Sequence, residues 1–200
     1  MKTHTNRILE LIRDIKFTQW VQFDHELIRL LKKEETSLEP IVWDSLKELA
    51  HHESTYLKEA LSTRKDLPVE TMKLLAEEKW GIRVTLAVNP NLPEELMDTL
   101  SRDRQYFVRG ALASNPSIPQ RLMRVFSQDV DWVRGLLATN TSIPRGLMEL
   151  LAEDQTLFVR DLLAKNPALP EDMMERMALA FHPSVREALA ENPNCPEHLK

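Results

Sequence analysis

Apolar and polar residues recur along most of this chain in a pattern that repeats about every 26 residues. An asparagine marks each repeat, and a proline stands four residues after it. Apolar residues lie seven, four and three positions before the asparagine, as at Val159, Leu162 and Leu163. This i, i+3, i+4 spacing predicts one face of an α-helix and differs from the alternation of a β-strand. The asparagines are Asn89, Asn115, Asn140, Asn166 and Asn192, and the prolines are Pro93, Pro119, Pro144, Pro170 and Pro196.

A second apolar stripe follows each proline at the third, fourth and seventh positions, as at Leu122, Met123 and Phe126. We expect the proline to take the first helical position, where its missing N–H is not needed. A repeat of about 26 residues cannot hold two full helices and two turns. We therefore expect a first helix of roughly three turns and a short second helix, either α or 3₁₀. Neither helix buries its apolar face alone, so the repeats must stack into a solenoid with one continuous core.

An arginine precedes each asparagine by six residues, and in three repeats an aspartate precedes that arginine by five or six residues. The arrangement resembles that of HEAT repeats, in which such pairs brace adjacent repeats. We expect bracing here, and the alternative is a row of guanidinium groups that contacts a phosphate backbone or an acidic partner. The asparagines are expected to satisfy backbone groups at chain reversals and to bridge repeats. The arginines are Arg83, Arg109, Arg134, Arg160 and Arg186, and the aspartates are Asp103, Asp129 and Asp154.

The pattern Val-Arg-x-x-Leu-Ala-x-Asn-Pro-x-Leu-Pro, found at residues 159–170, resembles the leucine-rich repeat variant family, a HEAT-like α-solenoid. The resemblance covers residues 56–200 as six repeats with the last truncated, and Thr141 and Arg64-Lys65 depart from the pattern. It implies an all-α, right-handed superhelix of alternating α- and 3₁₀-helices. Some relatives carry an N-terminal iron–sulfur cluster on cysteines. This chain has one cysteine, Cys195, so we expect no cluster and no other cofactor.

The N-terminal segment, residues 1–55, does not show the repeat pattern. Three apolar stripes predict three helices, which we interpret as a cap that seals the first repeat. The alternative is a partner-binding pair of helices that carries Phe17, Trp20 and Phe23, because aromatic residues are common at binding hot spots.

Charge and composition reduce the number of function classes that fit the sequence. The net charge is -5, and residues 81–200 carry 13 Lys and Arg against 16 Asp and Glu, which disfavours binding to nucleic acid. A single cysteine fits a reducing compartment. The sequence contains no uncharged stretch near the roughly 18 residues that a membrane span needs. We expect a bacterial, cytoplasmic protein without membrane association.

Motifs for catalysis or metal binding are not evident. His25-Glu26 begins like a zinc-protease helix, but Arg29 stands where the second histidine should be. His51-His52-Glu53 is at most a weak metal cluster, and Cys195 occupies an apolar position. We predict no catalytic, metal or cofactor-binding residues and therefore no enzyme. The periodic methionines are expected to fill the core, and they are Met72, Met97, Met123, Met148 and Met174.

Function is then expected at the irregular positions of the second helices, where acidic repeats flank a basic middle. We predict a non-catalytic protein-interaction module or scaffold that recognises its partner by charge pattern. The predicted binding residues are Arg121, Arg124, Arg145, Glu94, Glu95, Asp98, Glu171, Asp172 and Glu175.

The alternative is a nucleic-acid-binding solenoid or a HEAT-like DNA glycosylase. A glycosylase needs a buried carboxylate beside aromatic residues, and Trp80 or Trp132 near Asp131 is the candidate. The last repeat is cut short at Lys200, so we expect either that the chain is a fragment or that it self-associates through its open C-terminal repeat.

Overall fold

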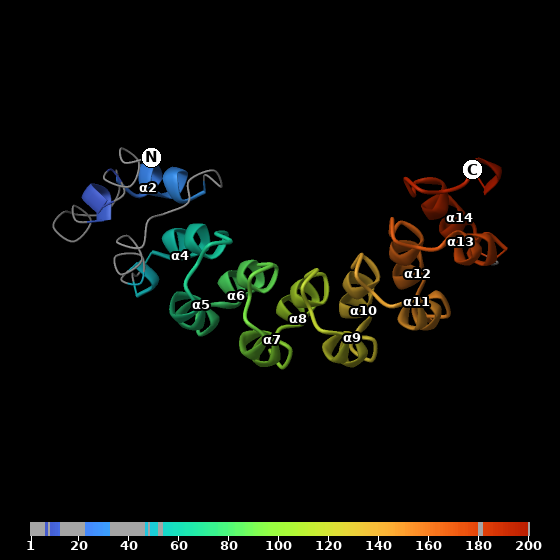
Figure 1. The fold of residues 1–200 in the computed structure, drawn as a ribbon, viewed down its shortest axis with the longest axis horizontal. Helices are drawn as coiled ribbons and strands as arrows, with labels where there is room; N and C mark the ends of the chain where they lie inside the picture. Colours follow the sequence, from blue (N-terminus) through green and yellow to red (C-terminus); the bar gives the residue numbers. More distant parts are fainter. Residues whose placement is uncertain are drawn as a thin grey trace. The chain divides into compact units, whose positions relative to one another are not determined.

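The computed structural model describes residues 7, 9–12, 23–32, 47, 49–51, 54–179 and 182–199. These residues form helices and turns, and none of them lies in a β-strand (Figure 1). The predicted all-α fold is confirmed. The chain divides into two compact units, unit 1 at residues 1–96 and unit 2 at residues 97–200.

Unit 1 contains α2 (Phe23–Leu31), α4 (Thr55–Ser62), α5 (Val69–Ala76) and α6 (Trp80–Ala87), and α7 (Glu94–Leu100) crosses the division. Helix α2 packs on α4, which packs on α6. The buried side chains of Leu27 and Leu31 in α2 lie on the predicted second stripe. Phe17 and Trp20 lie outside the described residues, as does the side chain of Phe23. The N-terminal cap and its boundary at residue 55 stay predictions.

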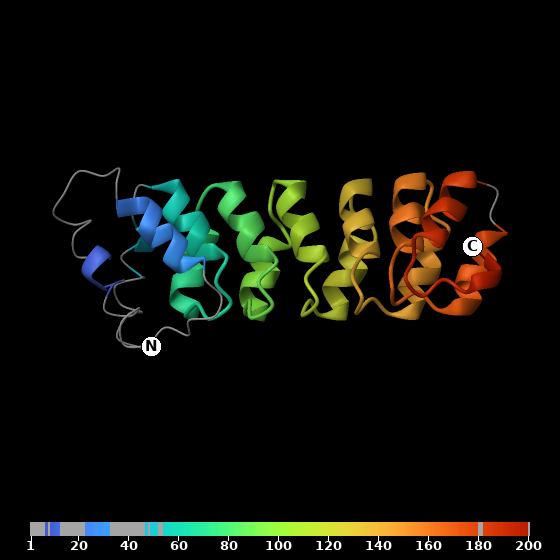
Figure 2. The same ribbon diagram turned by 90° about the horizontal axis from the view of Figure 1, so that it is seen from above.

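Unit 2 is a stack of helix pairs. The first helices of the repeats, α8, α10, α12 and α14, pack against one another, and each of the second helices, α9, α11 and α13, packs on first helices. Figure 1 shows the first helices in one row and the second helices in another, and Figure 2 shows the helices side by side from above. This packing confirms the solenoid. Below, the first-helix face and the second-helix face are the exposed surfaces of these two rows. The helices of unit 2 are α8 (Tyr106–Ala113), α9 (Gln120–Phe126), α10 (Asp131–Ala138), α11 (Arg145–Ala152), α12 (Leu157–Ala164), α13 (Glu171–Ala178) and α14 (Pro183–Ala190), and a 3₁₀ turn, η2 (Glu197–Leu199), follows them.

The predicted length of the first helices was wrong, whereas the second helices are short as expected and take the α form of the two that were considered. Each first helix in unit 2 has 8 residues, about two turns rather than three. The second helices are α-helices of 7 or 8 residues, and among the described residues a 3₁₀ helix occurs only at η2. The reason is that the two turns of each repeat take up the remaining residues.

The prolines lie one position earlier than predicted, at the N-cap rather than inside the helix. Pro119 has φ -69° and ψ 144°, so its backbone is extended and the helix begins at Gln120. Its carbonyl oxygen accepts the N–H groups of Leu122 at 2.9 Å and Met123 at 3.3 Å. The first of these bonds is of 3₁₀ type. Proline suits this position because it fixes φ and still offers its carbonyl to the first turn.

The core runs between the two rows of helices and has the predicted composition. Val108, Leu112, Val133 and Leu137 are buried at the positions that the helical spacing identified. The five periodic methionines and Cys195 are buried as well. The interpretation of these residues as packing elements is therefore confirmed.

Candidate protein-binding faces

Buried asparagines join consecutive repeats. Asn140 Nδ2 donates to the carbonyl oxygens of Ala113 and Asn115 in the preceding repeat, both at 2.9 Å. Its Oδ1 accepts the N–H of Ser142 at 2.8 Å. Because these groups are buried, each would otherwise remain without a partner. The predicted bridging role is confirmed, and Asn166 and Asn192 make the same three bonds in their own repeats.

In unit 1, Arg64 takes the place of the asparagine. Its Nη1 donates to the Leu31 carbonyl oxygen at 3.0 Å. Its Nε and Nη2 bind the two carboxylate oxygens of Asp66 at 2.8 and 2.7 Å. Leu31 ends α2 as Ala113 ends α8, so α2 is related to α4 as a first helix is to the next. The arginine side chain therefore makes the hydrogen bond to the preceding first helix that Asn140 makes in its own repeat.

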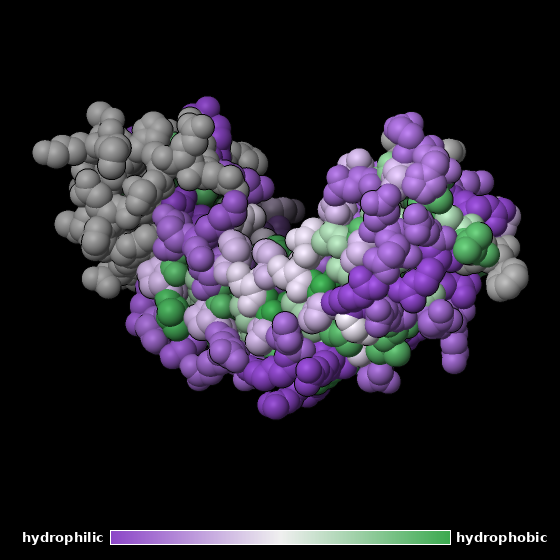
Figure 3. Space-filling view, turned by 45° about the vertical axis from the view of Figure 1, so that its right-hand side comes forward, coloured by the Kyte–Doolittle hydropathy of each residue, from purple (hydrophilic) through white to green (hydrophobic). Residues whose placement is uncertain are grey.

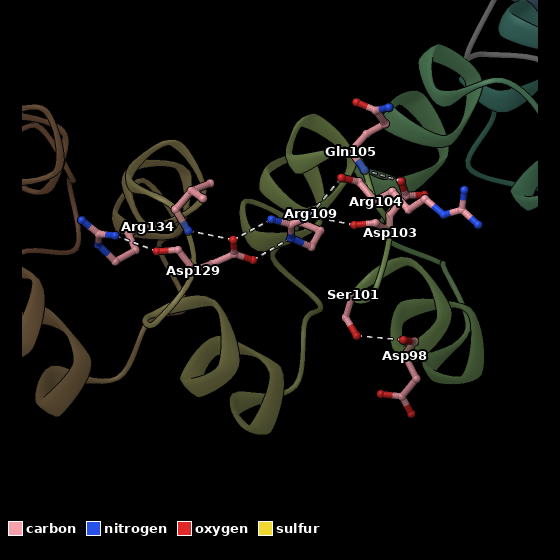
Figure 4. Close-up of polar contacts among 9 residues, drawn as sticks. Asp98, Ser101, Asp103, Arg104, Gln105, Arg109, Asp129 and Arg134 are labelled. Atoms are coloured by element: carbon pink, nitrogen blue, oxygen red, sulfur yellow. Dashed lines mark hydrogen bonds and ion pairs between the residues drawn. The ribbon is translucent and has the colours of Figure 1, made fainter.

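A row of partly buried ion pairs braces the first helices. Arg109 Nε and Nη2 bind the two carboxylate oxygens of Asp129 at 2.6 and 2.7 Å, and its Nη1 donates to the carbonyl oxygen of Asp103 at 2.7 Å (Figure 4). Arg134 binds Asp154 in the same way, at 2.6 and 3.0 Å. Bracing is confirmed. The carboxylate partner comes from the following repeat, whereas the preceding aspartate supplies its backbone carbonyl.

The ionisation of these pairs reflects their surroundings. Burial alone would raise the pKa of Asp129, but hydrogen bonds from the Arg109 side chain and the Val130 N–H outweigh it and hold the pKa below its usual value. Asp154 behaves alike, because the bonds from Arg134 and Thr156 outweigh its desolvation and lower its pKa. Both carboxylates are therefore charged at neutral pH and are bound to arginine.

Arg160 occupies the same position in α12 but lacks the pair. Its Nε is buried without a hydrogen-bond partner. Among the described residues, none forms an ion pair with its guanidinium. In the sequence, the register that places Asp129 and Asp154 places Ala180 next, 26 residues after Asp154. The row of ion pairs therefore lacks its carboxylate at this repeat.

Four of the nine predicted binding residues form two ion pairs with each other. Arg121 Nη2 lies 3.0 Å from Asp98 Oδ2, and Arg145 Nη1 lies 3.1 Å from Asp172 Oδ1. The bond from the Arg121 side chain lowers the pKa of Asp98, and the bond from Arg145 lowers that of Asp172. All four side chains are exposed or nearly so. Their charges are thus partly neutralised before any partner arrives.

The remaining five predicted residues are Arg124, Glu171, Glu175, Glu94 and Glu95. Arg124 is exposed, and no described residue forms an ion pair with it. Glu175 faces His198, with 3.6 Å between carboxylate and ring nitrogen, and Glu171 lies beside them. These three groups are exposed and close enough to hold a metal ion, although exposed acidic groups are common without one. Glu94 and Glu95 are exposed at the start of α7.

Four aromatic side chains line the first-helix face of unit 2, and we call them the aromatic row. Tyr106 and Phe107 begin α8, Trp132 is the second residue of α10, and Phe158 is the second residue of α12. The Trp132 and Phe158 rings are stacked, with centroids 5.6 Å apart. Phe107 meets Trp132 edge-on at 6.2 Å. Each of the four residues is 38–40% exposed.

Glycines make room for the aromatic row. A Cβ atom on Gly110 would lie 3.2 Å from the Trp132 ring and 2.8 Å from Leu136 Cδ1. A Cβ atom on Gly135 would overlap the Phe158 ring. Sequence reasoning missed this face, although the signal was a glycine in one repeat and an aromatic residue near the start of the next first helix. In Figure 3 the lower edge, where the second helices lie, is largely hydrophilic, and paler and greener surface is gathered above it.

The residues named for the glycosylase alternative, Asp131, Trp80 and Trp132, are all exposed. Asp131 is exposed and accepts the backbone N–H of Trp132 at 2.8 Å, so it is not the buried carboxylate that the hypothesis required. His51 is exposed, and His52 and Glu53 lie outside the described residues. Within the described part of the chain, no helix has the length and apolar character to cross a bilayer.

Comparison with solved structures identifies the architecture. The chain is similar to a protein described as a leucine-rich repeat variant with a novel repetitive protein structural motif, with a TM-score of 0.60 and 22% sequence identity. The alignment covers 97% of this chain and 79% of the other. The chain has the fold of a leucine-rich repeat variant. No family model and no curated protein matches its sequence. The similarity confirms the fold and the repeat pattern that the sequence predicted, and it carries no information about activity.

Proposed function

We propose that this chain is a non-catalytic module that binds a protein partner through the exposed faces of its repeats. The observation that carries the proposal is the network of buried bonds between repeats. Asn140, Arg109 and Arg134 fix each repeat to its neighbour, so the side chains exposed on both faces are held in place before binding. A preorganised surface loses less entropy when it binds, and repeat arrays commonly use such surfaces to bind other proteins.

The titratable groups support a non-catalytic role. Among the described residues, the carboxylates with shifted pKa values are Asp98, Asp129, Asp154 and Asp172, and each has a lowered pKa and accepts hydrogen bonds from arginine. A general acid needs the opposite, a carboxyl group whose pKa is raised toward neutral pH. These shifts are those expected of structural ion pairs.

The buried ion pairs also count against nucleic acid as the partner. Arg109 and Arg134, which would have to contact phosphates, already bind Asp129 and Asp154. Their side chains are at most 20% exposed. A phosphate would have to displace a bidentate carboxylate at each of them, which makes a continuous phosphate-binding row unfavourable.

The predicted charge pattern on the second-helix face is part of the proposal. Arg124 is its most available cation, because Arg121 and Arg145 bind neighbouring acids. A partner that recognises this face by charge should therefore depend more on Arg124 than on Arg121.

Affinity capture of partners from an extract of the native host tests the proposal. The intact chain should retain at least one protein after nuclease treatment, and a gel-shift titration with DNA and RNA should show only weak binding that disappears as salt rises. Arg124→Glu should weaken capture through the second-helix face more than Arg121→Glu, with the melting temperature unchanged for Arg124→Glu. Salt-resistant binding of nucleic acid, or a protein partner captured only through bound nucleic acid, would contradict the proposal.

A further inference from the structure

We infer that the aromatic row and Arg160 form one docking surface, and that its occupant is a segment of another protein with apolar side chains and a carboxylate. This inference rests on the proposed function and adds the surface and the chemistry of the partner. It depends on three features of unit 2: the exposed rings, the unpaired guanidinium, and the presence of the last ring, Phe158, and Arg160 in the first turn of α12.

The aromatic row provides the apolar part of the surface. Its four residues lie on three consecutive first helices and are each 38–40% exposed. Isolated exposed apolar residues are ordinary, but contiguous rings on one face are typical of protein-binding surfaces. Gly110 and Gly135 leave the space that the rings occupy, because a larger residue there would push Trp132 and Phe158 aside. The surface is therefore built into the repeat.

The geometry of the rings favours a protein segment over nucleic acid. The Trp132 and Phe158 rings are nearly parallel, with 10° between their planes and 5.6 Å between their centroids. Phe107 meets Trp132 edge-on, with 74° between the ring planes. A nucleic-acid base needs a free ring face on which to stack. Here Trp132 and Phe158 stack on each other, which covers one face of each ring, and the exposed edges suit aliphatic side chains.

Arg160 provides the charged part. In the two preceding repeats the guanidinium binds both oxygens of an aspartate. At Arg160 the Nε is buried without a partner, and no described residue accepts a hydrogen bond from the terminal nitrogens. A partly buried cation without a counter-ion is unfavourable, so a carboxylate that reaches its terminal nitrogens gains a charge-assisted bond. The position is complementary to Asp or Glu.

The two parts are adjacent in the fold. Phe158 and Arg160 both belong to the first turn of α12. Phe158 leans on Gly135 of the preceding first helix, whereas the arginines equivalent to Arg160 reach toward the following repeat. A segment that follows the row from α8 and continues across α12 toward the next repeat therefore approaches the side of α12 from which Arg160 extends. In α14 the equivalent of Phe158 is Ser184, whose hydroxyl binds Asp161 Oδ1 at 3.1 Å, so the row of rings ends at α12.

Selection of peptides on the intact chain tests the inference. The probe is a phage-displayed library of random 12-residue peptides, and enriched peptides are then synthesised with a fluorescent label for anisotropy titrations. We expect enriched peptides to combine apolar residues with at least one Asp or Glu. Trp132→Ala should lower their affinity by at least about tenfold, and Arg160→Gln by about fivefold.

Matched controls lie on the second-helix face. Leu150→Ala removes another exposed apolar side chain, and Arg124→Gln removes another arginine without an ion-pair partner among the described residues. Neither should change the affinity of the peptides. The melting temperature of each variant shows whether it folds, and Arg160→Gln keeps the test valid if Trp132→Ala unfolds the chain.

Three results would overturn the inference. Enriched peptides could lack acidic residues, their affinity could survive Trp132→Ala or Arg160→Gln, or the aromatic row could bind a single-stranded oligonucleotide instead. If a captured host protein depends on Arg124 and not on Trp132, this inference fails and the proposed function stands. If neither peptides nor host proteins bind, both fail.

Discussion

Two sets of ion pairs link successive repeats of unit 2, and they differ in burial. The pairs Arg109–Asp129 and Arg134–Asp154 lie between the first helices, with side chains 7–20% exposed. The pairs on the second-helix face, Asp98–Arg121 and Arg145–Asp172, have side chains 38–55% exposed. In the sequence both sets are simply acids and arginines at the repeat period. Burial decides that the first set holds the array together and that the second set contributes little stability.

The largest expected effect follows from breaking a buried pair. Arg134→Ala leaves the Asp154 carboxylate, 7% exposed, without its cation. The free energy of unfolding should fall by about 3 kcal/mol. Arg160→Ala is the matched control and should cost less than about 1 kcal/mol, because this arginine has no carboxylate to abandon. Chemical denaturation of both variants measures the difference, and equal losses would show that the ion pair is not the source of the stability.

A smaller loss is expected where a glycine carries the aromatic row. Gly135→Ala forces the Phe158 ring to move, because the new Cβ atom would overlap it. We expect a loss of about 2 kcal/mol. Gly146→Ala in α11 is the control: nothing lies within 4 Å of its Cβ position, and alanine favours the helix by about 1 kcal/mol. Thermal melting should therefore shift in opposite directions for the two variants, and a shift in the same direction would contradict the packing described.

Acid should weaken the ion pair between Arg134 and Asp154, because protonation removes the charge of the carboxylate. Each unit by which folding lowers the pKa of Asp154 corresponds to about 1 kcal/mol in the free energy of unfolding, and acid removes that contribution. The folded-state pKa lies below the ordinary value of 3.8, so the contribution is fully present above that pH and is lost as the pH falls through the folded-state value. Asp154→Asn removes the titrating group. The stability difference between the natural chain and this variant should shrink as the pH falls below about 4. A constant difference would mean that Asp154 does not contribute as a charged group.

The exposed pairs should give the smallest effect. Arg145→Ala should cost less than about 1 kcal/mol, and the loss should diminish further in high salt, because exposed pairs are screened by ions. Denaturation at low and high ionic strength measures both values. A loss as large as that of Arg134→Ala would remove the distinction between the two sets.

The fold could be predicted from the sequence because the same helical spacing of apolar residues recurs in every repeat. Val133 and Leu137 are buried where the helical period placed them, and Asn140 bridges repeats as its position at the chain reversal suggested. The helix lengths were wrong because turn residues cannot be counted from apolar spacing alone. Local spacing also suggested Asp103 as the acid partner of Arg109, whereas stacking brings in Asp129 from 20 residues further on.

The binding face was harder to predict for a related reason. Trp132 and Phe158 occur near the starts of helices, where an aromatic residue fits a core as well as a surface. Their exposure depends on Gly110 and Gly135 in the preceding repeats, which only the stacked structure reveals. The charges of the second helices were visible in the sequence, but the bonds between Arg121 and Asp98 and between Arg145 and Asp172 were not.

Hydroxyl-radical footprinting of the intact chain, free and bound to a protein captured from its host, tests the central claim most directly. The account predicts that the partner protects Phe107, Trp132 and Phe158 from oxidation, while Leu150 on the second-helix face remains as reactive as in the free chain. Unchanged reactivity of the three aromatic residues in a complex that is otherwise fully formed would contradict it.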